Sequence, residues 1–160
     1  MAHLPSDAGT RPRLPDIDGP LIDAPEYLIS FLQRLNRDQM ESVLRPSGLK
    51  LASWRVLSCL EERGSMSLLD LAELSVTERT VLSRLVDKLC ARGLVSKDAF
   101  SHDRRVSMVA ITRQGRDALR KSMAGVHRLR MHLFSGFSEA EYDTLRDLLN
   151  RLKVNAQTLL

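Results

Sequence analysis

The chain has 160 residues, 43% of them hydrophobic and 28% charged, a composition typical of a soluble globular protein with a packed core. No apolar run approaches the roughly 20 residues that span a bilayer, and the N-terminal stretch lacks the apolar region of a secretory signal. We therefore expect a cytoplasmic protein without a membrane partner, in which Cys59 and Cys90 are reduced thiols.

The net charge of +4 is unevenly distributed along the chain. Between Ser75 and Arg130, 13 lysines and arginines face 5 acidic residues, so this segment carries +8 and the remainder −4. A basic middle between acidic flanks favours nucleic acid or another polyanion as the partner. Solvated helix faces also produce such an imbalance.

Helices dominate the first predicted elements. Residues 1–23 are rich in proline, aspartate and glycine, and we interpret them as a mobile arm. A first helix follows and closes at residues 45–48, Arg-Pro-Ser-Gly. A second helix over residues 52–63 is expected to end at a left-handed Gly64. The apolar stripe of the first helix comprises Leu28, Phe31, Leu32 and Leu35, and the buried candidates of the second include Trp54, Leu57 and Leu60.

Two helices joined by a tight turn come next. Ser67 begins a short helix with a capped start and a brief apolar face. Residues 74–77 form the predicted turn. The following helix begins near Ser75 or Thr77 and runs to Arg92, before Gly93.

A hairpin and two further helices complete the chain. Residues 94–98 and 106–111 predict two strands, connected by a projecting loop. Thr112 caps a long helix, and Ser138 opens the last one with a capping box. The predicted fold class is therefore mainly α with a small β-hairpin. The apolar positions of the long helix are Leu119, Val126 and Leu133, and those of the last helix are Tyr142, Leu145, Leu149 and Leu152.

The helix that contains residues 77–89 has two chemically different faces. Its apolar residues fall within an arc of about 140°, which must face the core. The opposite face carries hydroxyls and arginines near the positive end of the helix, as a helix in a DNA major groove requires. A solvated face that happens to carry these residues is the alternative. The core-facing set is Val81, Leu82, Leu85, Val86 and Leu89, and the outer set is Thr80, Ser83, Arg84 and Asp87, with Arg79 at the edge and Thr77 near the start.

The loop sequence His-Asp-Arg-Arg at residues 102–105 indicates that the hairpin is a DNA-binding wing. A wing beside a recognition helix reaches the adjacent minor groove, whose negative potential attracts arginine. Asp103 is placed to pair with Arg105 and orient it, while Arg104 and His102 lie against phosphates. An incidental surface ion pair on a solvated loop is the alternative.

These motifs together resemble the MarR family of bacterial transcription regulators. The resemblance rests on Ser83-Arg84-Leu85, Asp87-Lys88-Leu89, Gly93-Leu94, Asp103-Arg104-Arg105 and Ile111-Thr112-x-x-Gly115, with support from Gly48-Leu49 and Trp54-Arg55-Val56-Leu57. It covers about residues 25–158. Ile111 stands where the family usually has leucine, and Ser83 where it usually has threonine.

The resemblance implies a homodimeric winged helix–turn–helix protein that binds double-stranded DNA at a pseudo-palindromic operator. Residues 1–23 are then the arm, 24–46 and 113–160 the dimerisation helices, and 47–112 the DNA-binding domain. The predicted DNA-contacting residues are Thr77, Arg79, Thr80, Ser83, Arg84, Lys88, Asp103, Arg104 and Arg105.

The resemblance also implies a repressor that leaves DNA when a small aromatic or phenolic acid, or its thioester, binds. Tyr27, Phe31 and Trp54 are candidates to line that site, with Arg55 as the carboxylate partner. Core aromatics beside a surface arginine are the alternative.

Other chemistries find little support in the sequence. It shows no nucleophile–base constellation and no metal-ligand cluster, so we expect neither an enzyme nor a cofactor or metal site. We interpret Cys59 and Cys90 as buried structural thiols. Two other functions remain open: a winged-helix module that docks a protein without DNA, and a redox sensor acting through these cysteines.

Overall fold

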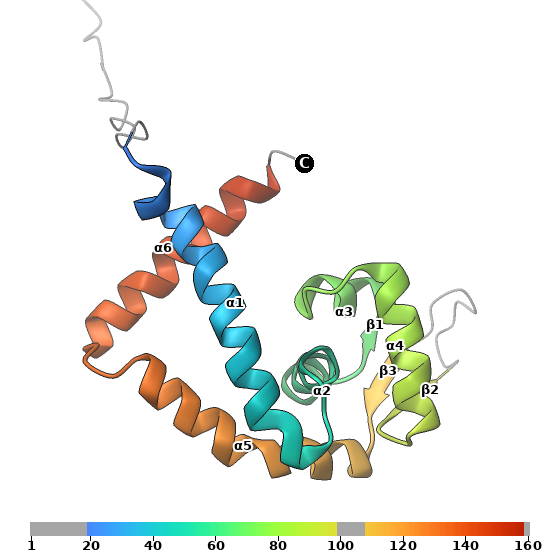
Figure 1. The fold of residues 1–160 in the computed structure, drawn as a ribbon. Coiled ribbons are helices and arrows are strands. Elements are labelled where there is room, and N and C mark those ends of the chain that lie inside the picture. Colours follow the sequence, from blue (N-terminus) through green and yellow to red (C-terminus); the bar gives the residue numbers. More distant parts are fainter. Residues whose placement is uncertain (1–18, 99–107, 159–160) are drawn as a thin grey trace, which may run out of the picture. The chain divides into compact units, whose positions relative to one another are not determined.

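The computed structural model describes residues 19–98 and 108–158, in two compact units that divide between Asn36 and Arg37. The protein is mostly helical and contains a small antiparallel sheet (Figure 1). Its α-helices are α1 (Pro25–Leu44), α2 (Leu51–Arg63), α3 (Leu68–Leu74), α4 (Arg79–Ala91), α5 (Arg113–Leu133) and α6 (Glu139–Gln157). Its strands are β1 (Met66–Ser67), β2 (Val95–Asp98) and β3 (Met108–Ile111), and single 3-10 turns lie at Leu21–Asp23 and Arg45–Ser47.

This order confirms the predicted fold class of a helix–turn–helix followed by a hairpin between terminal helices. Two local expectations were wrong. Leu21–Asp23 forms a 3-10 turn although we assigned it to the arm, whereas residues 1–18 lie outside the described part. Gly64 has φ 80° and ψ −156°, so its backbone is not the left-handed helical one.

The sheet has the strand order β1-β3-β2, with β3 in the centre. Val95 pairs with Ile111 and Asp98 with Met108 in the antiparallel β2–β3 ladder. The sequence missed β1, which pairs Met66 with Val109, because two residues are too short for an alternation pattern to be visible.

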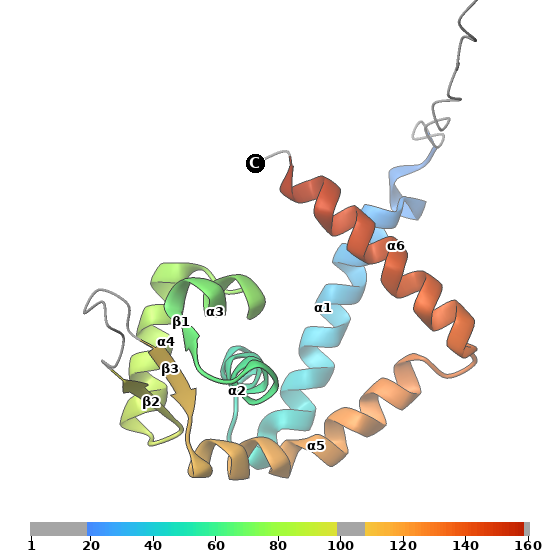
Figure 2. The same cartoon turned by 180° about the vertical axis from the view of Figure 1, so that it is seen from behind.

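The main core lies between α2, α3, α4 and the sheet, all of which belong to the second unit (Figures 1 and 2). Burial of each leucine or valine here stabilises the fold by about 1.5–3 kcal/mol. Trp54 is half-buried and packs on both this core and a smaller cluster of Met40, Leu44 and Val126. Side chains with no exposed surface are Leu44, Val56, Leu57, Leu71, Leu82, Val86 and Val109.

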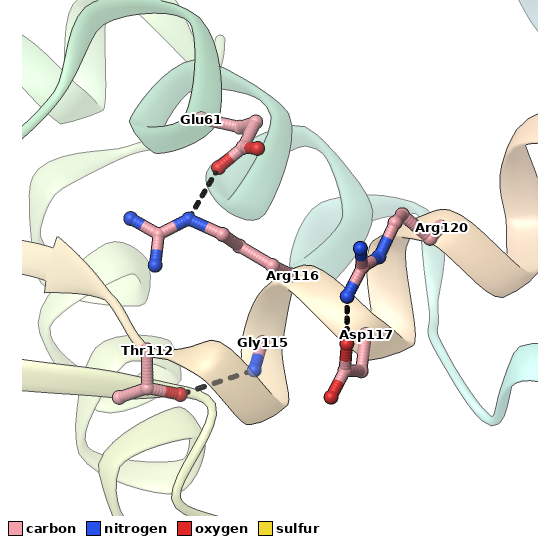
Figure 3. Close-up of polar contacts among 6 residues, drawn as sticks. All are labelled: Glu61, Thr112, Gly115, Arg116, Asp117 and Arg120. Carbon is pink, nitrogen blue, oxygen red and sulfur yellow. Dashed lines mark hydrogen bonds and ion pairs between the residues drawn. The ribbon is translucent and has the colours of Figure 1, made fainter.

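The start of α5 is tied to the sheet and to α2 (Figure 3). The Thr112 hydroxyl accepts from the Gly115 backbone N–H at 3.0 Å, which confirms the predicted cap, and donates to the Gly93 carbonyl at 2.7 Å. Arg116 Nε donates to Glu61 Oε2 of α2 at 3.0 Å. These bonds hold the end of α4, the hairpin and α5 in fixed positions relative to one another.

No described helix is both long and apolar enough to cross a bilayer.

Candidate nucleic-acid interface

The segment that leads to α4 consists of the capped helix α3 and a turn that contains one strained residue. The Ser67 hydroxyl accepts from the Asp70 backbone N–H at 3.2 Å, which confirms the predicted start of α3. Val76 has φ 52°, and its side chain is 78% exposed. The Thr77 hydroxyl donates to the Ser75 carbonyl at 3.2 Å. These features fix the direction in which α4 leaves the turn.

Helix α4 begins at Arg79, later than the predicted start at Ser75 or Thr77, because the turn continues to Glu78. Its buried face consists of Leu82, Val86 and Leu89. Leu85 is half-buried at the edge of the core.

Val81 does not belong to the buried face, contrary to our expectation. Its side chain is 52% exposed. The apolar arc that we drew was too wide, because Val81 lies about 100° from Leu82 around the helix. It also lies in the first turn of α4, where the core covers less of the helix.

The outer face of α4 carries its polar residues at the N-terminal half and centre. Arg79, Thr80, Arg84 and Lys88 are exposed. Among the described residues, none of these three cations forms an ion pair. The Thr80 hydroxyl donates to Glu78 Oε1 at 2.9 Å, and its lone pairs remain acceptors. Ser83 and Thr77 are half-buried, so the structure brings six of the predicted residues to α4 and the turn before it.

Asp87, the acidic residue of this face, is paired with Lys97 of β2. Both side chains retain exposure, 63% for Asp87 and 31% for Lys97, so the pair contributes little to stability. Its effect is local, because it offsets the carboxylate charge and links α4 to the base of the hairpin. The sequence did not reveal this contact, which joins residues ten apart through the α4–β2 turn.

The remaining predicted DNA contacts, Asp103, Arg104 and Arg105, lie in residues 99–107, outside the described part, as does His102. Strands β2 and β3 flank this segment on both sides and pair with each other. The paired strands confirm the hairpin, whereas the roles of the loop residues stay predictions.

The four candidate ligand residues fall in different units. Tyr27 and Phe31 are one turn apart on α1, 49% and 43% exposed, in the first unit. Trp54 and Arg55 are neighbours on α2 in the second, and both are half-buried. Trp54 Nε1 is buried and has no hydrogen-bond partner among the described residues. The shared pocket stays a prediction.

The helix–turn–helix and the hairpin also occur in known proteins with similar sequences. Residues 49–107 match the model of the MarR family. The HTH-type transcriptional repressor IacR from Pseudomonas putida is 26% identical over 137 residues, which cover 86% of this chain and 82% of IacR. The matched segment, residues 49–107, is therefore similar to the MarR family.

Solved structures of MarR-type regulators have the same fold. CouR from Rhodococcus jostii, bound to p-coumaroyl-CoA, has a TM-score of 0.75 and 26% identity, covering 83% of this chain and 94% of CouR. The M. tuberculosis regulator MOSR, in complex with DNA, has a TM-score of 0.72 and 23% identity, covering 86% and 98%. This chain therefore has the winged-helix fold of these proteins.

The two cysteines of the chain are less buried than expected. Cys59 and Cys90 are both half-buried, are free thiols, and pack at the edge of the main core. Burial, together with the nearby Glu62 carboxylate, raises the pKa of the Cys59 thiol, which disfavours the reactive thiolate. No described group of three or more histidine, cysteine or acidic side chains is arranged to hold a metal ion.

Proposed function

We propose that this regulator is a homodimeric repressor that places α4 in the DNA major groove and leaves its operator when a small aromatic acid, or its thioester, binds. The observation that carries the proposal is the outer face of α4. Arg79, Arg84 and Lys88 are exposed there, and Leu82, Val86 and Leu89 anchor the opposite face in the core. A rigid helix that presents exposed cations and hydroxyls has the donors that base edges and phosphates accept.

The positions along α4 suggest different roles. Arg79 and Thr80 lie in the first turn, where the helix dipole favours a nearby phosphate. Arg84 lies one turn further, at the centre of the exposed face, where a guanidinium can pair with a guanine edge. Ser83 and Lys88 flank it, and Thr77 reaches the same face from the turn. In the wing, Asp103 orients Arg105 toward the minor groove, and Arg104 contacts phosphate.

The dimer is supported by helix faces that have exposed apolar residues in the described part of one chain. No residue of α6 is buried, although the helix has 19 residues. Its Leu148, Leu149 and Leu152 are 52%, 43% and 44% exposed. Burial of such a face against a second copy is the usual means of stabilising it. We assign residues 24–46 and 113–160 to this interface and 47–112 to DNA binding. The stripe of α1 is likewise exposed, at Leu28, Phe31, Leu32 and Leu35.

The effector is inferred from the relatives and from residue chemistry. CouR binds p-coumaroyl-CoA, the thioester of a phenolic acid. Trp54 supplies an indole N–H without an acceptor among the described residues, and the adjacent Arg55 supplies a cation for a carboxylate. Tyr27 and Phe31 add aromatic surface.

The central test replaces Arg84 with alanine. The operator is represented by the duplex that the wild-type chain selects from a random-sequence pool, and affinity is measured by fluorescence anisotropy at fixed salt. We expect Arg84→Ala to weaken binding tenfold or more, because one bidentate arginine–guanine pair contributes about 1–3 kcal/mol. Equal affinity of both proteins would overturn the role of α4.

Arg128→Ala is the matched control, since Arg128 is an exposed arginine of α5, about 22 Å along the helix from its start. It should leave the affinity unchanged. The wild-type affinity should also fall steeply with salt, with a slope of about 0.9 per neutralised phosphate in a double-logarithmic plot. A flat salt dependence would instead favour a protein-docking module.

A further inference from the structure

Val81 is an apolar side chain on the polar face of α4. It is 52% exposed, and it shares one stripe with Arg84 and Lys88, which follow it by three and seven residues. Thr80 precedes it on the same exposed side. Apart from Ala91 at the end of the helix, Val81 is the one exposed apolar residue of α4.

The fold does not account for this exposure. The core side of α4 is centred on Leu82, Val86 and Leu89, and Leu85 is half-buried against that core. Val81 is absent from both hydrophobic clusters of the described residues. A smaller or polar side chain would satisfy the packing of this position equally well.

We infer that Val81 contacts the 5-methyl group of a thymine and thereby selects a T·A pair within each half-site. The inference rests on the proposed placement of α4 in the major groove. Thymine is distinguished there by its C5 methyl group, and small apolar side chains are the groups that recognise it. Arg84, one turn further along the same stripe, provides the polar contact to a neighbouring base pair.

The expected size of the effect follows from the surface removed from water. Burial of one methyl group against another apolar group strengthens binding about fourfold. A contact of this kind adds sequence preference but little overall affinity, whereas Arg84 contributes to both.

Two substitutions isolate the methyl group. Val81→Thr keeps one branch methyl and adds a hydroxyl, while Val81→Ser adds the same hydroxyl and has no branch methyl. All three proteins are first compared by thermal unfolding, and each then selects duplexes from a random-sequence pool. In the duplex selected by the wild type, thymines are replaced by deoxyuridine at one symmetric pair of positions at a time.

We expect the wild type and Val81→Thr to lose affinity about fourfold per methyl at one such position. Val81→Ser should bind the thymine and deoxyuridine duplexes equally, and its selected sequences should be degenerate there. The inference is overturned if Val81→Ser keeps the thymine preference, or if no deoxyuridine replacement affects the wild type. Binding that Arg84→Ala does not weaken would instead overturn the proposed function, and this inference with it.

Discussion

Val76 holds a backbone conformation that branched residues rarely adopt. Its φ of 52° brings the Cβ close to the following carbonyl, at a cost of about 1–2 kcal/mol for an L-residue. The side chain is 78% exposed, so its burial offsets little of this conformational cost. The turn nevertheless keeps the conformation, because Ser75 beside it is buried and the Thr77 backbone N–H donates to the Ala72 carbonyl at 3.0 Å.

Val76→Gly should therefore raise the free energy of unfolding by about 0.5–1 kcal/mol. Glycine removes the left-handed strain but loses about 0.4–1 kcal/mol through the greater freedom of the unfolded chain. Urea unfolding at one protein concentration checks this, with an unchanged slope and a higher midpoint as the expected result. Val76→Asn is the control, since asparagine tolerates the same backbone region. A lower midpoint for both variants would show that the turn is not strained.

The capping box at the start of α6 lowers the pKa of Glu141. Its carboxylate accepts from the Ser138 backbone N–H at 2.8 Å and from the Ser138 hydroxyl at 2.7 Å, and these bonds lower the pKa of the carboxyl. A carboxyl with a lowered pKa in the folded state stabilises the fold above its unfolded pKa of about 4.3. That contribution is lost as pH falls through the lower, folded value.

Glu141→Gln should accordingly lower the urea midpoint at neutral pH and make no difference in strong acid. Comparing the midpoints of wild type and variant from about pH 7 to about pH 3 measures the contribution of this group alone. The difference should shrink as pH falls below about 4.3. A difference that stays constant across this range would contradict the ionised cap.

At the scale of elements, the junction of β3 and α5 depends on the absence of one side chain. A Cβ on Gly115 would lie 2.1 Å from the Leu94 carbonyl oxygen, which is backbone and cannot move freely. Gly125 of the same helix is also crowded, but its nearest neighbour is the Val43 side chain at 2.8 Å. The two glycines thus differ in what an added methyl group would displace.

Gly115→Ala should destabilise the protein by about 2–3 kcal/mol, since overpacking against backbone forces the start of α5 away from the sheet. Gly125→Ala is the matched control and should cost less, because the Val43 side chain can shift by a few tenths of an ångström more easily than the Leu94 backbone, and alanine favours the helix. Thermal unfolding of the three proteins tests the order. If Gly125→Ala is the less stable variant, the close approach at Gly115 does not govern this junction.

Elements were predicted well where a pattern extends over a turn or more of helix. The caps at Ser67, Thr112 and Ser138 gave the starts of α3, α5 and α6, because a side chain that accepts from the third following N–H is a local signal. The start of α4 lacks such a signal, as Glu78 makes no side-chain cap bond. The two-residue β1 and the Asp87–Lys97 pair depend on tertiary contacts, which periodicity does not encode.

The polar residues of the outer face of α4 were predicted correctly, but the boundary between this face and the buried one was not. Helical periodicity identified its polar residues, and the structure confirms that Arg79, Thr80 and Arg84 are exposed. It misplaced Val81, because hydrophobicity indicates burial only where a core is close enough to cover the side chain.

At the scale of the whole molecule, the exposed leucines of α6 predict the oligomeric state. Light scattering at micromolar concentration should give a mass of about twice 18.0 kDa. The double variant Leu149→Glu with Leu152→Glu should give the monomer mass, because two buried charges in an apolar interface are strongly unfavourable. Asn150→Glu adds a charge at an exposed polar position of the same helix and should leave the dimer intact. A monomeric wild type would refute the dimer.

The anchoring of α5 at Gly93 and Glu61 has a mechanical consequence. The helix has 21 residues and is about 32 Å long, and it is held at a second place, because Val126 packs with Met40 and Leu44. Val126 lies about 20 Å along the helix from its first residue. A rotation of α5 would therefore change both attachments together, so a disturbance at one of them reaches the other through a single rigid rod.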